Sequence, residues 1–301
     1  MSSLTSGEQL ATVGELELCY ETFGDRSDPA LVLIMGLGTQ MIAWRDEFCE
    51  GLAARGFFVV RFDNRDVGRS TWLNQYPVPS VWQLLRRDKD AASYTLEDMA
   101  GDVAGLLDHL GVERAHIVGA SMGSMIAQTL AVTHPERVLS LVSIMGNTGS
   151  RLSGQPTLRA SKALLGVPPK DRDGYIEHTV KTFALIGSPG FERDEADLRE
   201  LARTAFDRGR NPAAGGRQLA AIIASGDRTK RLRAVTAPTL VIHGKDDKLV
   251  RASGGRATAK AIDGAELLEI AGMGHDLPRD AWPQIIDAIV ANAARASAAR
   301  A

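Results

Sequence analysis

The sequence is short of cysteine, of excess charge and of long apolar runs. Cys19 and Cys49 are its two cysteines among 301 residues, which is too few for a disulfide framework, so both are expected to be free thiols without a catalytic role. Lysine plus arginine number 35 and aspartate plus glutamate number 37, for a net charge of -2. That balance offers no basic field for a nucleic-acid backbone, so no nucleic-acid partner is expected.

Nothing in the sequence points to a membrane or to export. Residues 1–8 show no basic segment followed by an apolar one, so no secretion signal is expected. The longest apolar runs, such as residues 138–145, fall well short of the ~18 residues that a membrane-spanning helix needs. We therefore expect a cytoplasmic protein without a membrane span. The sequence leaves open whether it is a monomer or a homodimer.

The chain alternates short apolar, β-branched runs with amphipathic helices. Continuous apolar runs are typical of strands that are buried on both faces. Such strands are predicted at residues 30–36, 57–62, 115–119, 138–145 and 238–243. Residues 15–23 alternate like an antiparallel strand, and residues 266–270 form a last short strand. Helices between the strands indicate βαβ units and a mostly parallel sheet.

This strand rhythm stops after the run that ends at residue 145. Residues 147–233 show helical patterning interrupted by glycine and proline, and no convincing buried strand. So long an insertion within an α/β sheet is rarely a plain loop, and we expect a helical cap or lid over residues 147–233. Residues 1–146 and 234–301 would then form the sheet domain.

Ser121 lies at the centre of the motif Gly119-Ala120-Ser121-Met122-Gly123. A predicted buried strand precedes the motif, and a predicted helix follows it. A tight strand-to-helix turn holds a serine at strained backbone angles, and its neighbours must be small because larger side chains would clash. The turn also places the serine at a helix N-terminus, where partial positive charge favours a developing anion. The motif therefore predicts Ser121 as a catalytic nucleophile.

A serine hydroxyl needs a base that removes its proton, and a histidine normally serves. The six histidines are His109, His116, His134, His178, His243 and His275. Only His275 is both late in the chain and on a glycine-rich loop after the last predicted strand. That loop belongs to the carboxyl edge, where open α/β sheets place ligands. His275 is therefore the predicted general base.

The acid that orients this histidine has two adjacent candidates. Asp246 and Asp247 both follow the strand predicted at residues 238–243. Spacing from Gly244 favours Asp247 as the orienting acid and leaves Asp246 to cap or orient the loop. The other familiar position for this acid holds Asn147, which cannot serve.

Acyl transfer also needs two hydrogen-bond donors for the anionic oxygen of a tetrahedral intermediate. The turn at the serine supplies the backbone N–H of Met122. The second predicted donor is the N–H of Leu37, because the glycines on either side let the backbone approach a substrate. A plain strand-to-loop turn is the competing interpretation of this segment.

The chain order Ser121, Asp247, His275 and the motifs around these residues resemble the α/β-hydrolase superfamily over nearly the whole chain. Within it, the chain looks most like the carboxylesterase branch that includes aclacinomycin methylesterase and mycobacterial Lip-type esterases. The residues that carry this closer similarity are Ile34-Met35-Gly36, Phe62-Asp63-Asn64-Arg65-Asp66, Ala120-Ser121-Met122-Gly123, Ser143-Ile144-Met145 and Gly272-Met273-Gly274-His275-Asp276-Leu277-Pro278.

The resemblance implies an α/β-hydrolase fold: a mostly parallel eight-stranded sheet flanked by helices, with a helical cap inserted after strand 6. One departure is that many relatives carry His-Gly in the oxyanion loop, where this chain has Met35-Gly36. Because the donor is a backbone N–H, the oxyanion hole, the pair of donors for the anionic oxygen, is retained without that histidine. Residues 61–70 resemble another superfamily segment, and we interpret them as a salt-bridged scaffold beneath the site.

The loop between Ser70 and Thr95 is rich in apolar side chains and holds two of the four tryptophans. It indicates either an apolar wall that contacts substrate or a hydrophobic cluster packed under the cap. The residues predicted to line the substrate pocket are Gly36, Trp72, Trp82, Phe183 and Leu185. No group of residues suggests a metal site or an anion clamp, so neither a metal nor another cofactor is expected.

These features together predict a serine hydrolase that cleaves a carboxylic ester of a largely apolar small molecule through an acyl-enzyme. Thioester, lactone or C–C bond hydrolysis and perhydrolysis use the same residues and are alternatives. A ligand receptor of the same fold, without turnover, is a further alternative, because the fold alone does not decide function.

Overall fold

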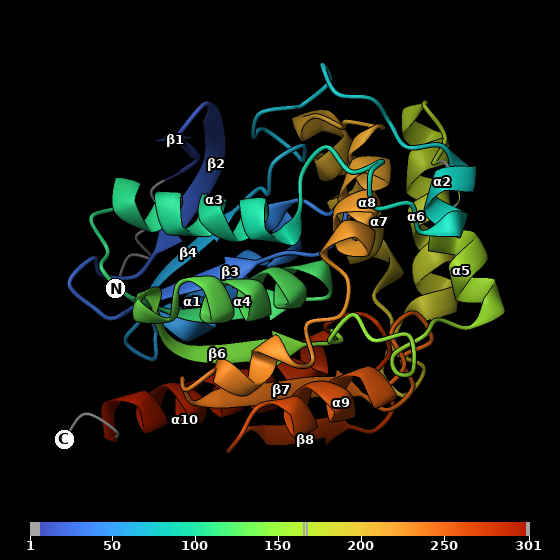
Figure 1. Ribbon diagram of the computed structural model, residues 1–301. Coiled ribbons are helices and arrows are strands. Elements are labelled where there is room, and N and C mark those ends of the chain that lie inside the picture. Colours follow the sequence, from blue (N-terminus) through green and yellow to red (C-terminus); the bar gives the residue numbers. More distant parts are fainter. Residues whose placement is uncertain (1–6, 165, 167, 299–301) are drawn as a thin grey trace.

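One eight-stranded sheet organises the protein. The computed structural model describes residues 7–164, 166 and 168–298, and its strands lie in the order β1-β2-β4-β3-β5-β6-β7-β8. The strands are β1 (Gln9–Val13), β2 (Leu16–Phe23), β3 (Ala30–Ile34), β4 (Phe58–Phe62), β5 (Ala115–Ala120), β6 (Val138–Ile144), β7 (Thr239–Gly244) and β8 (Glu266–Ile270). The pairs β1–β2 and β2–β4 are antiparallel, whereas every pair from β4 to β8 is parallel. The predicted mostly parallel sheet is confirmed (Figure 1).

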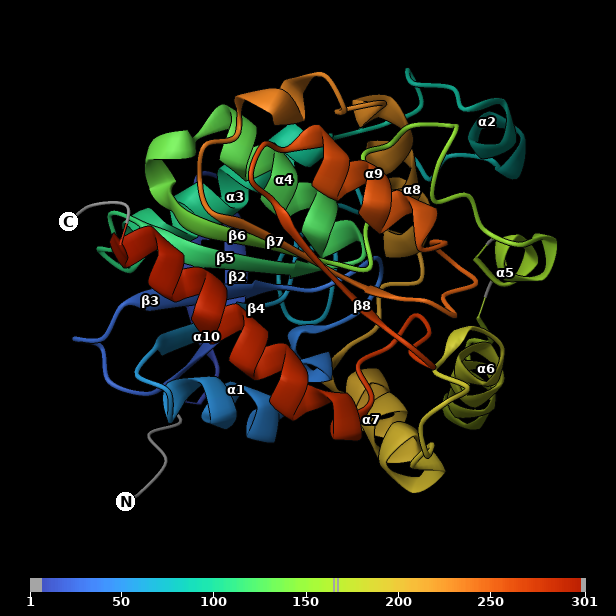
Figure 2. The ribbon, with the colours of Figure 1, turned by 90° about the horizontal axis from the view of Figure 1, so that it is seen from below.

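Helices cover both faces of this sheet. On one face lie α1 (Asp46–Ala53) and α10 (Trp282–Ala298), and on the other lie α3 (Leu96–His109), α4 (Met122–Thr133) and α9 (Ser253–Ala261). Figure 2 shows these layers on either side of the strands. Successive side chains of a strand point to opposite faces, so each buried strand serves both cores. In β3, Val32 and Ile34 belong to the core beneath α3 and α4, whereas Leu31 and Leu33 pack toward α1 and α10.

Four helices follow β6 in the chain, and we call them the cap. They are α5 (Leu158–Leu164), α6 (Arg172–Ile186), α7 (Glu195–Arg208) and α8 (Ala214–Ser225). Together with α2 (Val81–Arg86), they gather at one end of the sheet (Figure 1, right). This is the carboxyl end of β6, from which the chain enters the cap. The predicted helical cap after strand 6 is confirmed, while its boundaries at residues 147–233 stay a prediction.

The segment that follows β4 joins the sheet to the cap through buried ion pairs. Asp63 accepts a hydrogen bond from Arg208 at the end of α7, at 3.0 Å. Asp66 accepts two from the guanidinium of Arg217 in α8, at 2.8 and 2.7 Å. Both carboxylates are completely buried, and a buried charge needs such partners. The predicted salt-bridged scaffold is confirmed.

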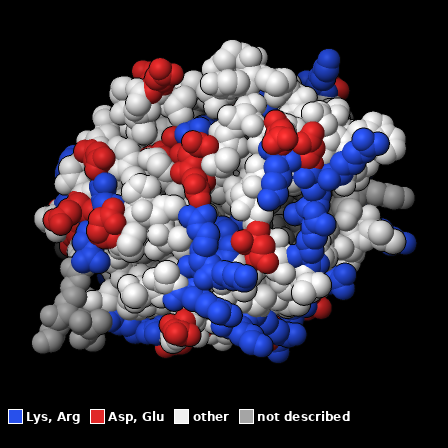
Figure 3. Space-filling model, in the orientation of Figure 1, with Lys and Arg blue, Asp and Glu red and all other residues white. Residues whose placement is uncertain are grey.

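The charges on the surface are mixed in sign, as the near-zero net charge suggests, and the two cysteines are unpaired. Figure 3 shows acidic and basic side chains interspersed on one face, so that neither sign covers it. No helix among the described residues is long and apolar enough to cross a bilayer, and within the same residues no cluster of metal-ligating side chains occurs. Cys19 and Cys49 are free and buried. Burial is the main cause that raises the pKa of each thiol to about 12, so neither is a reactive thiolate.

Candidate active site

Ser121 occupies the turn between β5 and α4. Its backbone has φ of 55° and ψ of -120°, a left-handed region that a residue with a side chain rarely adopts. The small neighbours are a steric requirement. A Cβ at Gly119 would lie 2.2 Å from the carbonyl oxygen of Gly123, and a Cβ at Gly123 would lie 2.1 Å from that of Ile34. The predicted strand, turn and helix around the serine are therefore present.

His275 lies on the loop after β8, between the serine and an aspartate. Its Nε2 is 2.9 Å from Ser121 Oγ, and its Nδ1 is 2.7 Å from Asp247 Oδ2. The aspartate carboxylate can only accept, so Nδ1 carries the ring proton and Nε2 presents its lone pair to the serine hydroxyl. The Ser121 side chain makes no capping bond to α4, which leaves its hydroxyl for the imidazole.

Asp247 is buried and fully hydrogen-bonded. Its Oδ1 accepts from the backbone N–H groups of Leu249 and Val250, both at 2.8 Å. Burial works against ionisation, but the charge of His275 and the hydrogen bonds from His243 and His275 outweigh it and lower the pKa of Asp247 to about 2. The residue is therefore a carboxylate at neutral pH, as an orienting acid must be.

The neighbouring Asp246 faces a different group. Its Oδ2 accepts from the N–H of Gly272 at 2.8 Å, and its own N–H donates to the carbonyl of Met273 at 3.0 Å. These bonds tie the loop after β7 to the loop that carries His275. The structure thus brings Asp247 to the imidazole and Asp246 to the backbone of the histidine loop.

The loop after β3 packs directly against the serine. A Cβ at Gly36 would lie only 3.0 Å from Ser121 Cβ. Met122 is the first residue of α4, so its N–H has no acceptor within the helix. Over the described residues, no protein oxygen accepts a hydrogen bond from the N–H of Leu37 either. Both N–H groups therefore lack a protein acceptor among the residues described, and their donation to an oxyanion stays a prediction.

The chain just after α6 holds the histidine loop from the cap side. The N–H of His275 donates to the carbonyl of Ile186 at 2.8 Å, and the N–H of Gly274 donates to Ser188 Oγ at 2.9 Å. Ser188 in turn donates to Asp276. Burial raises the pKa of Asp276. The position of the imidazole thus depends on this part of the chain as well as on β8.

His243 is a site residue that sequence reasoning did not assign. Its Nε2 is 2.7 Å from the carbonyl oxygen of Val250 and 3.5 Å from Asp247 Oδ2. A carbonyl only accepts, so Nε2 carries the proton, and in the described part of the chain Nδ1 has no hydrogen-bond partner. His243 therefore holds the loop after β7, which carries Asp247, in place by hydrogen bonding. Its position at the end of β7, four residues before Asp247, was the available signal.

The predicted pocket residues lie at different depths. Gly36 abuts the serine, and Phe183 and Leu185 are half-buried on α6. Trp72 is 38% exposed, while Trp82 on α2 is 71% exposed, so most of its ring faces solvent. Contact of these five residues with a substrate stays a prediction.

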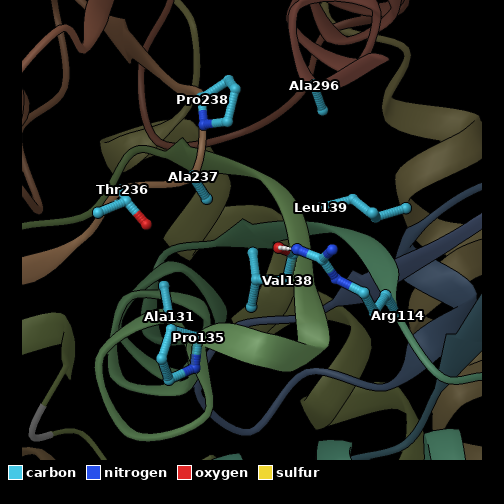
Figure 4. Close-up of a pocket in the computed structure, with 9 residues that line it drawn as sticks. All are labelled: Arg114, Ala131, Pro135, Val138, Leu139, Thr236, Ala237, Pro238 and Ala296. Atoms are coloured by element: carbon cyan, nitrogen blue, oxygen red, sulfur yellow. Dashed lines mark hydrogen bonds between the residues drawn. The ribbon is translucent and has the colours of Figure 1, made fainter. Parts of the chain in front are cut away.

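A separate hollow of about 220 Å³ is lined by other residues than those around the serine (Figure 4). Its lining includes Arg114 just before β5, Val138 at the start of β6 and Pro238 just before β7. These residues mark the amino ends of the parallel strands, whereas the serine and the aspartate follow their carboxyl ends. The hollow is therefore not part of the candidate active site.

The family of the chain follows from a sequence comparison. A profile of the alpha/beta hydrolase fold family matches residues 29–278, which include the serine, the aspartate and the histidine. The chain belongs to the α/β-hydrolase fold family. The structural likeness agrees: a hydrolase from Pseudomonas aeruginosa has a TM-score of 0.69 and 26% identity, over 95% of this chain and 98% of that one.

The relatives of this α/β-hydrolase include two methylesterases. Rhodomycin D methylesterase DauP of Streptomyces sp. (strain C5) is 30% identical over 94% of this chain and 97% of its own length. The corresponding DnrP of Streptomyces peucetius has the same identity and coverage. The 3-oxoadipate enol-lactonase 2 of Acinetobacter baylyi is 27% identical over 83% of this chain and 84% of its own. The predicted resemblance to α/β-hydrolase esterases is confirmed, and the protein is a hydrolase of this fold.

Proposed function

We propose that this protein is a serine carboxylesterase that cleaves an ester of a largely apolar small molecule through an acyl-enzyme. The observation that carries the proposal is one hydrogen-bonded chain, from Asp247 Oδ2 through both ring nitrogens of His275 to Ser121 Oγ, with distances of 2.7 and 2.9 Å. A serine alcohol becomes nucleophilic when a base lies within hydrogen-bond reach and a third group orients that base.

Ser121, His275 and Asp247 each have one role in the acylation step. Ser121 Oγ attacks the ester carbonyl carbon while His275 Nε2 takes its proton. The imidazolium that forms is stabilised by Asp247, which stays ionised because its pKa lies at about 2. When the tetrahedral intermediate collapses, His275 returns the proton to the departing alcohol oxygen. The acyl group is then an ester of Ser121.

The negative charge of the intermediate falls on the former carbonyl oxygen. The N–H groups of Leu37 and Met122 donate to this oxygen, and the N-terminus of α4 adds its partial positive charge. Neither donor has to be freed from a protein acceptor first. A water molecule then loses a proton to His275, attacks the acyl carbon and releases the acid and Ser121.

The methylesterase relatives support a carboxylic ester as the substrate. Both relatives are 30% identical over 94% of this chain, and both are named as methylesterases. We propose a short-alkyl ester of a larger, apolar acid, with Trp72, Phe183 and Leu185 beside the acid portion. Apolar and aromatic side chains are the usual lining of a site for such a ligand.

Lactone opening is the second candidate. The enol-lactonase relative, 27% identical over 83% of this chain, favours it. A lactone is a cyclic ester, so the same residues would form an acyl-enzyme in which the alcohol stays attached to the acyl group. The two functions differ in the shape of the pocket and not in the catalytic residues.

A panel of substrates tests the proposal, with Ser121→Ala as the blank. The panel holds p-nitrophenyl esters of increasing acyl length, methyl esters of aryl acids, and lactones. We expect steady turnover of esters, and Ser121→Ala should lower kcat by about 10⁶-fold. An absence of turnover on every ester and lactone, together with thermal stabilisation by the same compounds, would instead indicate a ligand receptor.

A further inference from the structure

Gln218, on α8 of the cap, reaches two loops of the sheet domain. Its side chain is completely buried. Its carboxamide oxygen accepts from the N–H of Gly38 at 2.7 Å, and its carboxamide nitrogen donates to the carbonyl of Arg65 at 3.1 Å. One side chain of the cap therefore joins the loops after β3 and β4.

The sheet domain holds the carbonyl groups of the loop after β3 by itself. The carbonyl of Met35 accepts from Asn64 Nδ2 at 2.9 Å. The carbonyl of Gly36 accepts from the N–H of Thr39 at 3.2 Å, and that of Leu37 accepts from Thr39 Oγ1 at 3.1 Å. All of these donors come from the same loop or from the segment after β4.

The N–H of Gly38 is different because its acceptor comes from the cap. It belongs to the peptide group between Leu37 and Gly38, which is held at its carbonyl end within the loop and at its N–H end by Gln218. Gly38 has a φ of +64°, a conformation that glycine enters and leaves without a steric penalty. Without Gln218, this peptide group loses the hydrogen bond at its N–H end. It is joined through the Cα of Leu37 to the peptide group that carries the N–H of Leu37, so that N–H is then oriented less firmly.

We propose that Gln218 is a positioning residue for the oxyanion hole, and that fast acyl transfer requires α8 to be packed against the loops after β3 and β4. The proposal rests on the esterase function proposed above. Gln218 touches no reacting atom; it acts through Gly38 on the N–H of Leu37. The helix is seated by the adjacent Arg217, whose buried guanidinium donates to both oxygens of Asp66.

The test compares the binding of an inhibitor that forms a tetrahedral oxyanion with the binding of one that keeps a planar carbonyl. Gln218→Met keeps the length of the side chain and removes both hydrogen bonds. We expect kcat/KM for a neutral ester to fall by about 10–100-fold, with KM changed by less than about twofold. The Ki of a trifluoromethyl ketone, which forms an anionic adduct with the serine, should rise by the same factor as kcat/KM falls. The Ki of the methyl ketone of the same shape should not change.

Ser225→Ala is the matched control on the same helix. Ser225 Oγ accepts from the N–H of Leu96 at 2.9 Å, so this variant also removes a bond between α8 and the sheet domain, but away from the oxyanion loop. It should leave both Ki values at those of the wild type. Gln218→Asn, whose amide is one methylene too short to make both bonds, is a second variant with the same expected pattern as Gln218→Met.

The outcomes separate the two proposals. Equal changes in both Ki values, or no change in a folded Gln218 variant, would refute the positioning role. Unfolding of both Gln218 variants at room temperature would also refute it, since Gln218 would then be required for folding. Wild-type turnover is measured first. If no ester is hydrolysed, the esterase proposal fails, and the positioning role fails with it.

Discussion

Asp247→Asn should inactivate the protein by reversing the position of the proton on His275. In the structure, Asp247 Oδ1 accepts from the N–H groups of Leu249 and Val250, both at 2.8 Å. An asparagine must place its carbonyl oxygen there, because an amide nitrogen facing two N–H groups would leave buried donors without acceptors. Its NH₂ group then takes the place of Oδ2, 2.7 Å from His275 Nδ1.

That NH₂ group can only donate, so His275 Nδ1 has to accept and its proton moves to Nε2. The Nε2–H then faces Ser121 Oγ at 2.9 Å and cannot take the serine proton. In a serine protease the same substitution leaves the geometry intact and lowers kcat by about 10⁴-fold, through the wrong tautomer. That loss corresponds to about 5.5 kcal/mol of transition-state stabilisation. We expect a loss of this size here.

Two measurements check the reasoning. The kcat/KM for the best ester gives the loss of activity, and ¹⁵N chemical shifts of His275 report the tautomer directly. Asp246→Asn is the control, because Asp246 accepts one bond from the N–H of Gly272, which an asparagine oxygen also accepts. A larger loss in Asp246→Asn than in Asp247→Asn would refute the assignment of the acid. An unchanged His275 tautomer in Asp247→Asn would refute the mechanism of the loss.

Three further predictions use other contacts. Gly36→Ala places a Cβ 3.0 Å from Ser121 Cβ and 3.5 Å from its Oγ, so kcat/KM should fall by about 100-fold in a protein that still folds; unchanged kinetics would contradict this packing. Arg217→Met removes the positively charged partner of the buried Asp66 carboxylate and should lower the free energy of unfolding in urea by about 3 kcal/mol. Adding Asp66→Asn should recover part of that loss, and strict additivity would count against the pair. The pKa of Asp247 is lowered from 3.8 to about 2, so it contributes about 2 kcal/mol of stability that is fully present above about pH 4 and lost as pH falls toward 2. The difference in unfolding free energy between wild type and Asp247→Asn should shrink over that range, and a constant difference would show that the pKa is not lowered.

The buried strands could be predicted because burial on both faces forces a continuous apolar run. The predicted strand at residues 30–36 is β3, which ends at Ile34. The prediction ran two residues too far because Met35 is also buried, in the loop that approaches the serine. Apolar character reports burial and not hydrogen bonding, so it marks the strand and its buried continuation alike.

Elements with few or no buried side chains gave no comparable signal. β1 lies at the edge of the sheet, and its Leu10 is 52% exposed. α2 contains no buried residue and starts at a capping box formed by Ser80 and Gln83. Hydrophobic periodicity cannot detect such elements, since their positions depend on caps and on neighbours contributed by distant parts of the chain.

The candidate catalytic residues could be predicted from local motifs, whereas the residues that hold them in place could not. The serine, the histidine and the aspartate each sit in a short segment whose spacing has a steric or chemical reason. Gln218 has no such context, since its partner Gly38 lies 180 residues away in the chain. The pairing depends on how α8 packs, which no local pattern specifies.

The four loops of the candidate active site are held partly by the sheet and partly by the cap. The backbone of Ser121 is held by the sheet, through its N–H bond to the carbonyl of Ile144 at 2.9 Å. The other three loops each have a partner between β6 and β7. Gln218 accepts from the loop after β3, and the carbonyl of Ile186 accepts from the loop that carries His275. The N–H of Thr157 donates to the carbonyl of Lys248, in the loop that carries Asp247, at 2.9 Å.

This division changes what substitutions in the cap should do. In an enzyme whose cap only lines the pocket, cap substitutions alter the binding of substrate and leave the chemical step alone. In the mechanism proposed above, the cap side also holds the loops that carry the oxyanion donor Leu37 and the imidazole of His275, and a shift of about 1 Å in such groups can cost about 100-fold in rate. Cap substitutions that alter substrate preference should therefore alter kcat as well as KM. Substitutions at Gln218 of α8 should lower kcat more strongly than substitutions in α5, which the structure places farther from the sheet (Figure 1).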